Sequence, residues 1–165
     1  MLRWSLPECA TLDIKGMMTF QEKQESKAYL AVLNYLRAAR LESSEKKKAW
    51  DEFQQALDGI VIDDSFKSAI QFWVLENLEH HHPEAIRVRE LHEMESILIS
   101  SAAHCKFLEA THHGMISLPQ GERLLDELLE NNETQFDGCD ETQMENGLLR
   151  IWKRNASKYK DVKVN

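Results

Sequence analysis

The stretch Thr19–Leu41, TFQEKQESKAYLAVLNYLRAARL, decides the fold class of this chain. It begins with Thr-Phe-Gln-Glu, a capping-box pattern in which the Thr hydroxyl and the Glu carboxylate accept hydrogen bonds from backbone amides that a helix start leaves free. Apolar residues then recur at spacings of three and four, which predicts an amphipathic helix over 19–41. The side chains expected to face the core are Tyr29, Leu30, Val32, Leu33 and Leu36.

The same spacing recurs along the rest of the chain, and strand-like alternation is scarce. Start and stop signals divide it into further segments: Ser43-Ser44 before a helix that Gly59 ends, Pro83 at a first-turn position, and a second capping box that begins at Ser117. The helices that we predict cover approximately 19–41, 44–58, 65–81, 83–113, 118–131 and 140–156. The sequence therefore predicts an all-α, single-domain bundle of about six amphipathic helices, with 1–18 as an N-terminal arm and 157–165 as a frayed basic tail.

The segment 83–113 is predicted to be the longest helix, ending at Gly114 and bending, if anywhere, at Ser100-Ser101. On one continuous helix of 100° per residue, one set of apolar residues shares a face. We expect these to point inward: Leu91, Met94, Leu98, Ala102, Cys105 and Leu108. Within the helix over 140–156, Gly147 is expected to be a weak point, because glycine destabilises helix interiors.

The composition excludes several classes of protein. The chain has 165 residues, with 20 Lys and Arg against 28 Asp and Glu, so its net charge is −8. A protein that grips phosphate backbones needs a basic face, so we expect no nucleic-acid partner. No apolar run approaches the ~20 residues that span a bilayer, and the N-terminus lacks the apolar region of a secretory signal.

Cysteine use indicates a reducing compartment. Cys9, Cys105 and Cys139 are three in number and widely separated, which favours free thiols and a cytoplasmic location. No glycine-rich phosphate loop, nucleophile elbow or HExxH zinc motif is present. Whether the chain is an enzyme stays open, and the missing motifs favour a non-enzyme.

The histidines offer two interpretations. LEHHHPEAIRVRELHE, Leu78–Glu93, contains four of the seven, and His112-His113 precede Gly114. Histidines at a helix C-terminus bond free carbonyls and favour the negative end of the helix dipole, which gives them a structural role. The alternative is a transition-metal or pH-sensing site. Its candidate ligands are the inward pair Glu109 and His112, and also His80 and His81.

Distance is an obstacle to a larger metal site. Two Glu-x-x-His pairs exist, Glu79–His82 and Glu109–His112. On a continuous helix with a rise of ~1.5 Å per residue, His82 and His112 would lie roughly 40 Å apart. No single ion could then collect ligands from both pairs unless the helix folded back at Ser100-Ser101.

Charge and aromatic residues suggest a binding function. The segment 122–145 is dense in acidic residues, and six Lys and Arg follow it in 150–163. Our first hypothesis is a non-enzymatic helical protein that acts as a regulator, adaptor or inhibitor, whose acidic surface binds a basic protein partner. The candidate interaction residues are Trp4, Glu122, Asp126, Glu127 and Glu130. The alternative is the metal-binding protein described above, and a homodimer is compatible with both.

The segment Phe107–Leu129, FLEATHHGMISLPQGERLLDELL, resembles helical hairpins in the cytosolic tails of cation/proton antiporters. The resemblance is carried by Gly114-Met115-Ile116-Ser117 and the leucines, and it covers under a third of the chain. It transfers no activity, partner or site residue to this chain.

Overall fold

The structure, a computed structural model, describes residues 18–40, 43–83, 89–133 and 138–161, with the backbone alone for 43–44 and 131–133. Within these residues the regular elements are seven helices and no named strand. They are α2 (Phe20–Ala38), α3 (Ser43–Asp58), α4 (Asp64–His80), α5 (Glu93–Leu98), α6 (Ser101–His112), α7 (Leu118–Glu133) and α8 (Glu141–Ser157). The predicted all-α class is confirmed, and five of the six predicted helices are present with ends within three residues.

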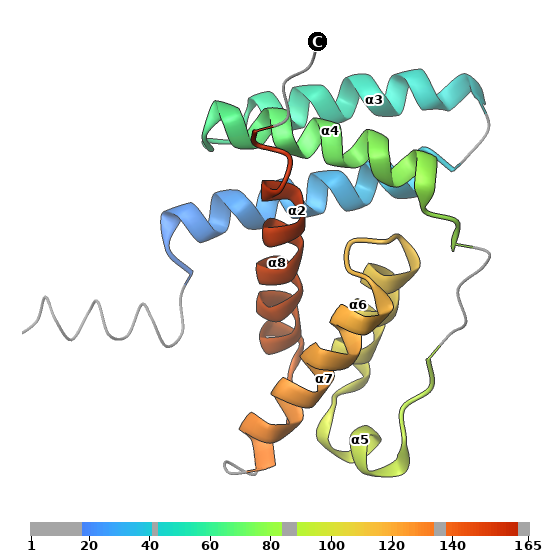
Figure 1. Ribbon diagram of the computed structural model, residues 1–165, viewed down its shortest axis with the longest axis vertical. Helices are drawn as coiled ribbons and strands as arrows, with labels where there is room; N and C mark the ends of the chain where they lie inside the picture. The colour runs from blue at the N-terminus through green and yellow to red at the C-terminus, as the bar shows by residue number, and fades with distance from the viewer. Residues whose placement is uncertain (1–17, 41–42, 84–88, 134–137, 162–165) are drawn as a thin grey trace, which may run out of the picture.

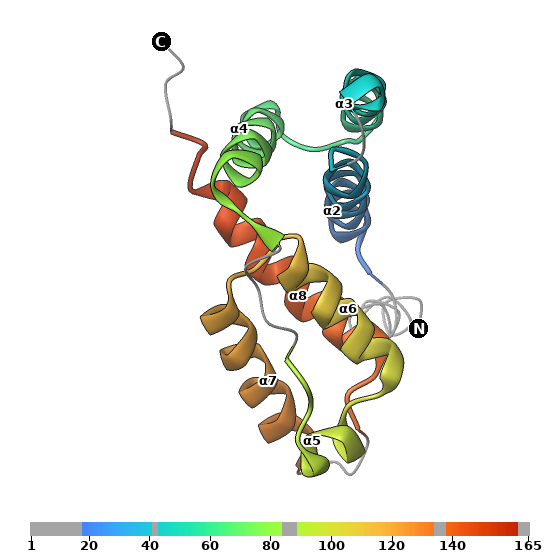
Figure 2. The same ribbon diagram turned by 90° about the vertical axis from the view of Figure 1, so that its right-hand side faces the viewer.

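Helix α8 organises the molecule. It stands upright in Figure 1, with α2, α3 and α4 layered across its upper end and α6 and α7 beside its lower half. It contacts α2, α4, α6 and α7, while the short α5 packs against α7 at the lower end of the molecule (Figures 1 and 2). None of the helices described is both long enough and apolar enough to cross a bilayer.

Trp152 of α8 packs against both α2 and α4 in the core. Its side chain is fully buried, and its ring centroid lies 5.5 Å from that of Tyr29 on α2 and 6.1 Å from those of Phe66 and Trp73 on α4. Edge-to-face aromatic contacts of this kind add to the stabilisation that burial alone provides. Lys153, the next residue, forms a 2.8 Å ion pair with the buried Glu25 of α2. One turn of α8 therefore fixes the upper layer.

Local capping signals set the helix starts as predicted. The Glu22 amide donates to Thr19 Oγ1 at 3.1 Å, and the Thr19 amide donates to Glu22 Oε2 at 3.2 Å. Ser117 and Gln120 make the same reciprocal pair at the start of α7, at 3.3 and 2.9 Å. The connector 60–62 between α3 and α4 forms no strand, and the Val61 amide donates to the buried Gln24 Oε1 at 2.9 Å.

The predicted single helix over 83–113 is wrong. Residues 89–92 are not helical, and the chain breaks again between α5 and α6, where Ile99 forms an isolated parallel bridge with Cys139. The Ser100 amide donates to the Cys139 carbonyl at 3.0 Å, and Ser100 Oγ then caps α6 by accepting from the Ala103 amide at 3.1 Å. The break thus lies at the serine pair where the sequence allowed a bend.

This break changes which residues face the core. The buried residues of α6 are Ala103, Phe107, Ala110 and Thr111. The predicted inward residues Met94, Ala102 and Cys105 are exposed instead, because the predicted face was counted along one continuous helix from residues that belong to another element. In α2, Leu30 was also expected to face inward and is 46% exposed.

Candidate interaction site

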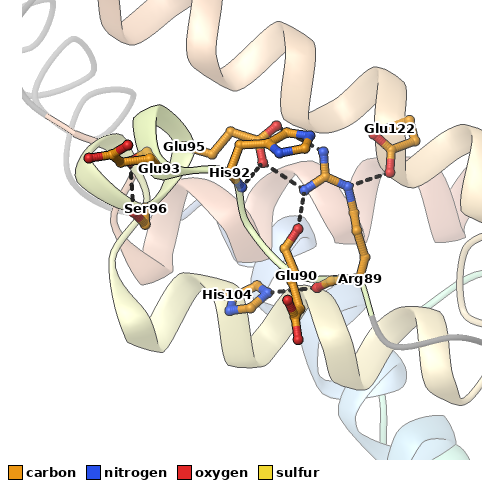
Figure 3. A network of polar contacts seen from close by, with 8 residues as sticks. All are labelled: Arg89, Glu90, His92, Glu93, Glu95, Ser96, His104 and Glu122. Carbon is orange, nitrogen blue, oxygen red and sulfur yellow. Dashed lines mark hydrogen bonds and ion pairs between the residues drawn. The ribbon is translucent and has the colours of Figure 1, made fainter.

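The segment that leads into α5 is held by one arginine. Figure 3 shows the Arg89 guanidinium between Glu95 of α5 and Glu122 of α7. Its two terminal nitrogens donate to the Glu95 carboxylate at 2.7 and 2.8 Å, and Nε donates to Glu122 Oε1 at 2.5 Å. Arg89 and Glu95 have side chains that are 18% and 13% exposed, so water screens their ion pair little. We call Arg89, Glu95 and Glu122 together the Arg89 fork. It connects the loop 89–92 and α5 to α7.

Further hydrogen bonds fix the same segment. The His92 amide donates to Glu95 Oε2 at 2.9 Å, and His104 Nε2 lies 3.3 Å from the Arg89 carbonyl (Figure 3). Hydrogen bonds from Arg89, and next from the His92 backbone, lower the pKa of Glu95 to about 2 although burial opposes this. The same ion pairs raise the pKa of Arg89. The Arg89–Glu95 pair is therefore charged at neutral pH.

Two large apolar side chains project from this fixed element. Met94 and Ile97 are 69% and 71% exposed, and their spacing of three places them on one face of α5. Directly after α5 the chain returns to the core, since Ile99 is 3% exposed. Neighbouring exposed apolar side chains on one face are found at interaction sites, where a few residues that become buried dominate the binding energy.

The predicted acidic residues of α7 adjoin this element. Glu122, Asp126 and Glu130 are exposed and lie four residues apart, so they follow one face of α7 from the Arg89 contact onward. Glu127 is on the neighbouring face and pairs with Arg150 Nη2 at 2.9 Å. The rest of the acidic stretch is partly neutralised, because Glu141 and Glu145 lie 3.7 and 3.4 Å from Lys106 Nζ. Trp4, the predicted anchor, lies outside the described residues.

The two histidine clusters meet in space, against the expectation of a large separation. Because the chain turns back between α4 and α6, His81 Nε2 lies 2.7 Å from the carbonyl oxygen of His112. The Asn77 side-chain amide donates to the Gly114 carbonyl at 3.0 Å beside it. A C-terminal histidine does bond a free carbonyl here, but the carbonyl belongs to the end of α6 and not to its own helix.

His113 is the buried member of this junction. It is 8% exposed, and its Nδ1 has no hydrogen-bond partner among the described residues. Burial is the main cause that lowers the pKa of His113 to about 4, and the nearby His112, Arg40, Arg37 and His81 contribute to the same shift. Charging this ring in place therefore costs stability, and the neutral form is the one that the fold accommodates.

The four metal candidates do not form one cluster of ligand atoms within the described residues. Glu109 forms an ion pair with Arg37 of α2, and His112 is exposed, so the pair does not face the core together as predicted. Among the described residues, the metal-type groups that place one ligand atom each within 4.8 Å of one another are Glu76, Glu79 and His80. The assignment of a metal to Glu109, His112, His80 or His81 stays a prediction.

Sequence reasoning missed the Arg89 fork and the apolar pair of α5. The signal that could have found them is His92-Glu93-Met94-Glu95, where Glu at the third helical position suggests a helix start. No protein-family model, curated protein or solved structure was found to match this chain.

Proposed function

We propose that this chain is a non-enzymatic helical protein of the cytoplasm that binds another protein through α5 and the adjoining face of α7. We call this region the α5 surface, and it consists of Glu90, Glu93, Met94, Ile97, Glu122, Asp126 and Glu130. The observation that carries the proposal is that Met94 and Ile97 are exposed on a helix that the Arg89 fork holds in place. The free thiols of Cys105 and Cys139 agree with a reducing compartment.

The fork favours binding because it orders the loop in advance. Immobilising flexible side chains and loops on association costs ~0.5–1.5 kcal/mol for each ordered side chain. A loop that is already fixed avoids much of this cost. Burying Met94 and Ile97 in a partner would contribute ~1.5–3 kcal/mol each, which makes them the expected anchors.

The charges around the anchors define the partner. Glu90, Glu93, Asp126 and Glu130 are exposed and have no ion-pair partner among the residues that the structure describes. A complementary partner therefore has an apolar pocket with Lys or Arg at its rim. Such rim charges act mainly on the association rate, so binding should weaken as salt rises from about 50 to about 500 mM.

The test is site-specific photo-crosslinking in the full-length chain. A photoreactive residue at Ile97 should capture a partner that the same residue at Val61, which is 63% exposed on the α3–α4 connector, does not capture. The captured protein must then bind the purified chain, and the double variant Met94→Ser, Ile97→Ser must weaken that binding at least tenfold while Val61→Ser leaves it unchanged. Capture of a second copy of the chain identifies a homodimer. Identical capture at Ile97 and Val61 would refute the proposal.

A second candidate function, transition-metal binding, is favoured by the cluster of Glu76, Glu79 and His80 at the end of α4. His80 Nε2 lies 3.4 Å from Glu76 Oε2 and 4.0 Å from Glu79 Oε2; Glu79 and His80 are exposed, and Glu76 is partly buried. Elemental analysis of untagged protein tests this candidate. Loss of metal in His80→Ala alone would place the ion at this cluster, loss in His112→Ala alone would place it at the predicted pair, and protein that holds no metal removes the candidate.

A further inference from the structure

A basic groove runs between α7 and α8 in a chain that is acidic overall. This hollow has a volume of about 580 Å³, and Leu124 and Ile151 are buried at its floor. Its charged lining residues are Arg123, Glu127, Arg150, Arg154 and Lys158. Four cations therefore face one anion here, whereas the whole chain has a net charge of −8.

Three of these four cations are available to a ligand. Arg150 is already paired with Glu127 at 2.9 Å. Arg123, Arg154 and Lys158 are exposed, and none of them forms an ion pair within the described part of the chain. Two other described arginines behave differently, since Arg37 is paired with Glu109 and Arg89 with Glu95 and Glu122. Unpaired like charges that repel one another along a groove are stabilised when an anion binds between them.

A second hollow continues the groove past the end of α8. Its volume is about 610 Å³, and it shares Gln120 and Lys158 with the first. Trp73, Ile116, Leu118 and Tyr159 contribute apolar and aromatic walls, and Leu118 is 42% exposed. No acidic side chain among the described residues lines this second hollow. We call the two hollows together the α8 trough.

We propose that the α8 trough binds an acidic peptide segment of a partner protein, with its carboxylates at Arg123, Arg154 and Lys158 and one apolar side chain in the hollow between Trp73 and Leu118. From Arg150 to Lys158 the helix rises ~12 Å, at ~1.5 Å per residue. An extended peptide covers that length in about four residues at ~3.3 Å each. A short acidic motif with an apolar residue at one end therefore fits the length of the trough as well as its charge.

The geometry favours a peptide over a nucleic acid. Binding to a phosphate backbone depends on a broad basic face, and here the cations are confined to one groove of a molecule with net charge −8. The aromatic and apolar end of the trough suits a side chain and offers no extended phosphate contact. The trough and the α5 surface have no residue in common, so this site does not depend on the proposed function.

The test uses the full-length protein and a fluorescein-labelled seven-residue peptide, five Glu followed by Leu-Phe. Anisotropy should show saturable binding that weakens with salt, and the peptide with Gln in place of Glu should not bind. The triple variant Arg123→Gln, Arg154→Gln, Lys158→Gln should bind at least about tenfold more weakly, as expected for three surface charge contacts. The matched control, Lys23→Gln, Lys46→Gln, Lys47→Gln, removes the same charge from exposed sites on α2 and α3.

The variant Glu127→Gln distinguishes peptide binding in the trough from a general effect of net charge or of unfolding. Among the described residues Glu127 is the only acid that lines the trough, and its replacement frees Arg150 from an ion pair, so the peptide should bind more tightly, by about twofold or more. Leu118→Ser should weaken binding of the Leu-Phe peptide and leave an all-Glu peptide unaffected. Equal weakening by the triple variant and its control would overturn the proposal. So would tighter binding of a single-stranded oligonucleotide of equal charge.

Discussion

Gly114, between α6 and α7, should not tolerate a side chain. Its φ of +73° is in the left-handed region, where a Cβ is strained. A Cβ built there would lie 2.7 Å from Cγ and 2.8 Å from Nδ1 of the His81 ring, and 2.8 Å from the Asn77 side-chain nitrogen. We therefore expect Gly114→Ala to separate the ends of α4 and α6.

Three contributions determine how much Gly114→Ala lowers the free energy of unfolding. Left-handed backbone costs an L-residue ~1–2 kcal/mol. Overlap in a packed site typically costs ~1–3 kcal/mol. The bonds at risk are the Asn77 amide to the Gly114 carbonyl at 3.0 Å and His81 Nε2 to the His112 carbonyl at 2.7 Å, each worth about 1 kcal/mol. Because movement that relieves the overlap also breaks the bonds, these do not simply add, and we expect a loss of about 2–4 kcal/mol in the free energy of unfolding.

Urea unfolding monitored by tryptophan fluorescence measures this loss, since Trp73 and Trp152 are buried. For a chain of this length the melting temperature should fall by ~2–4 °C for each kcal/mol. Gly59→Ala is the matched control. A Cβ at Gly59 would lie 3.6 and 3.7 Å from its nearest atoms, and its φ is not in the left-handed region, so its effect should stay within about 0.5 kcal/mol.

A double-mutant cycle separates overlap from backbone strain. In the His81→Ala background the ring is gone, and Gly114→Ala should then cost mainly the ~1–2 kcal/mol of left-handed backbone. If Gly114→Ala destabilised the chain no more than Gly59→Ala does, the packing of His81 and Asn77 against this glycine would be wrong.

Three further results are expected. Burial and neighbouring positive charge hold the pKa of His113 at about 4, whereas the unfolded chain binds this proton near 6.5, so stability should fall by at most about 3 kcal/mol as pH drops from about 6.5 to about 4. His113→Phe should remove that dependence in urea titrations, and parallel curves for both proteins would contradict it. Gly147→Ala should cost about 1–3 kcal/mol, because its Cβ would lie 2.5 Å from Leu124 Cδ1, and Leu124→Ala should relieve part of that cost in the double variant. Arg89→Gln should lower the free energy of unfolding by about 1–3 kcal/mol, because Glu95 loses its charged partner. It should also speed amide hydrogen exchange in α5 but not in α2. Unchanged exchange in α5 would argue against the fork.

The features that were predicted correctly depend on residues close to one another in the sequence. The capping pairs Thr19–Glu22 and Ser117–Gln120 join residues three apart, so the pattern of letters contains the whole interaction. Gly114 is likewise recognisable as a helix terminator, because its positive φ is a local property. Helix class and most helix ends follow from such signals, which is why the all-α fold could be predicted.

What the sequence missed depends on partners distant in the chain. The break at Ile99 is fixed by pairing with Cys139, which no window of residues around position 99 contains. Because that break was missed, the inward face of α6 was predicted from its spacing to Met94, which lies on another helix. The predicted face therefore excluded Phe107, which is buried. Gly147 shows the same limit, since no residue near it in the sequence indicates that it makes room for Leu124 of α7.

The candidate site was only partly predictable for the same reason. The acidic residues Glu122, Asp126 and Glu130 were identified from composition, and the structure places them beside α5. Met94 was predicted to be buried, because an apolar residue at helical spacing normally faces a core. Its exposure follows from Arg89, whose bonds to Glu95 and Glu122 turn the short helix against α7 by its polar side.

Two faces of α7 differ in charge, although the whole chain has a net charge of −8. One exposed face of this helix has Glu122 and Asp126, beside the apolar pair of α5, and the neighbouring face has Arg123, beside the bases of α8. The buried residues of α7, Leu124 and Leu125, fix its rotation, so both charged faces are set by the same packing against the core. The pI near 5.4 therefore describes neither face of α7. Under the two proposals made above, these oppositely charged surfaces would bind a basic and an acidic protein at the same time, as an adaptor does.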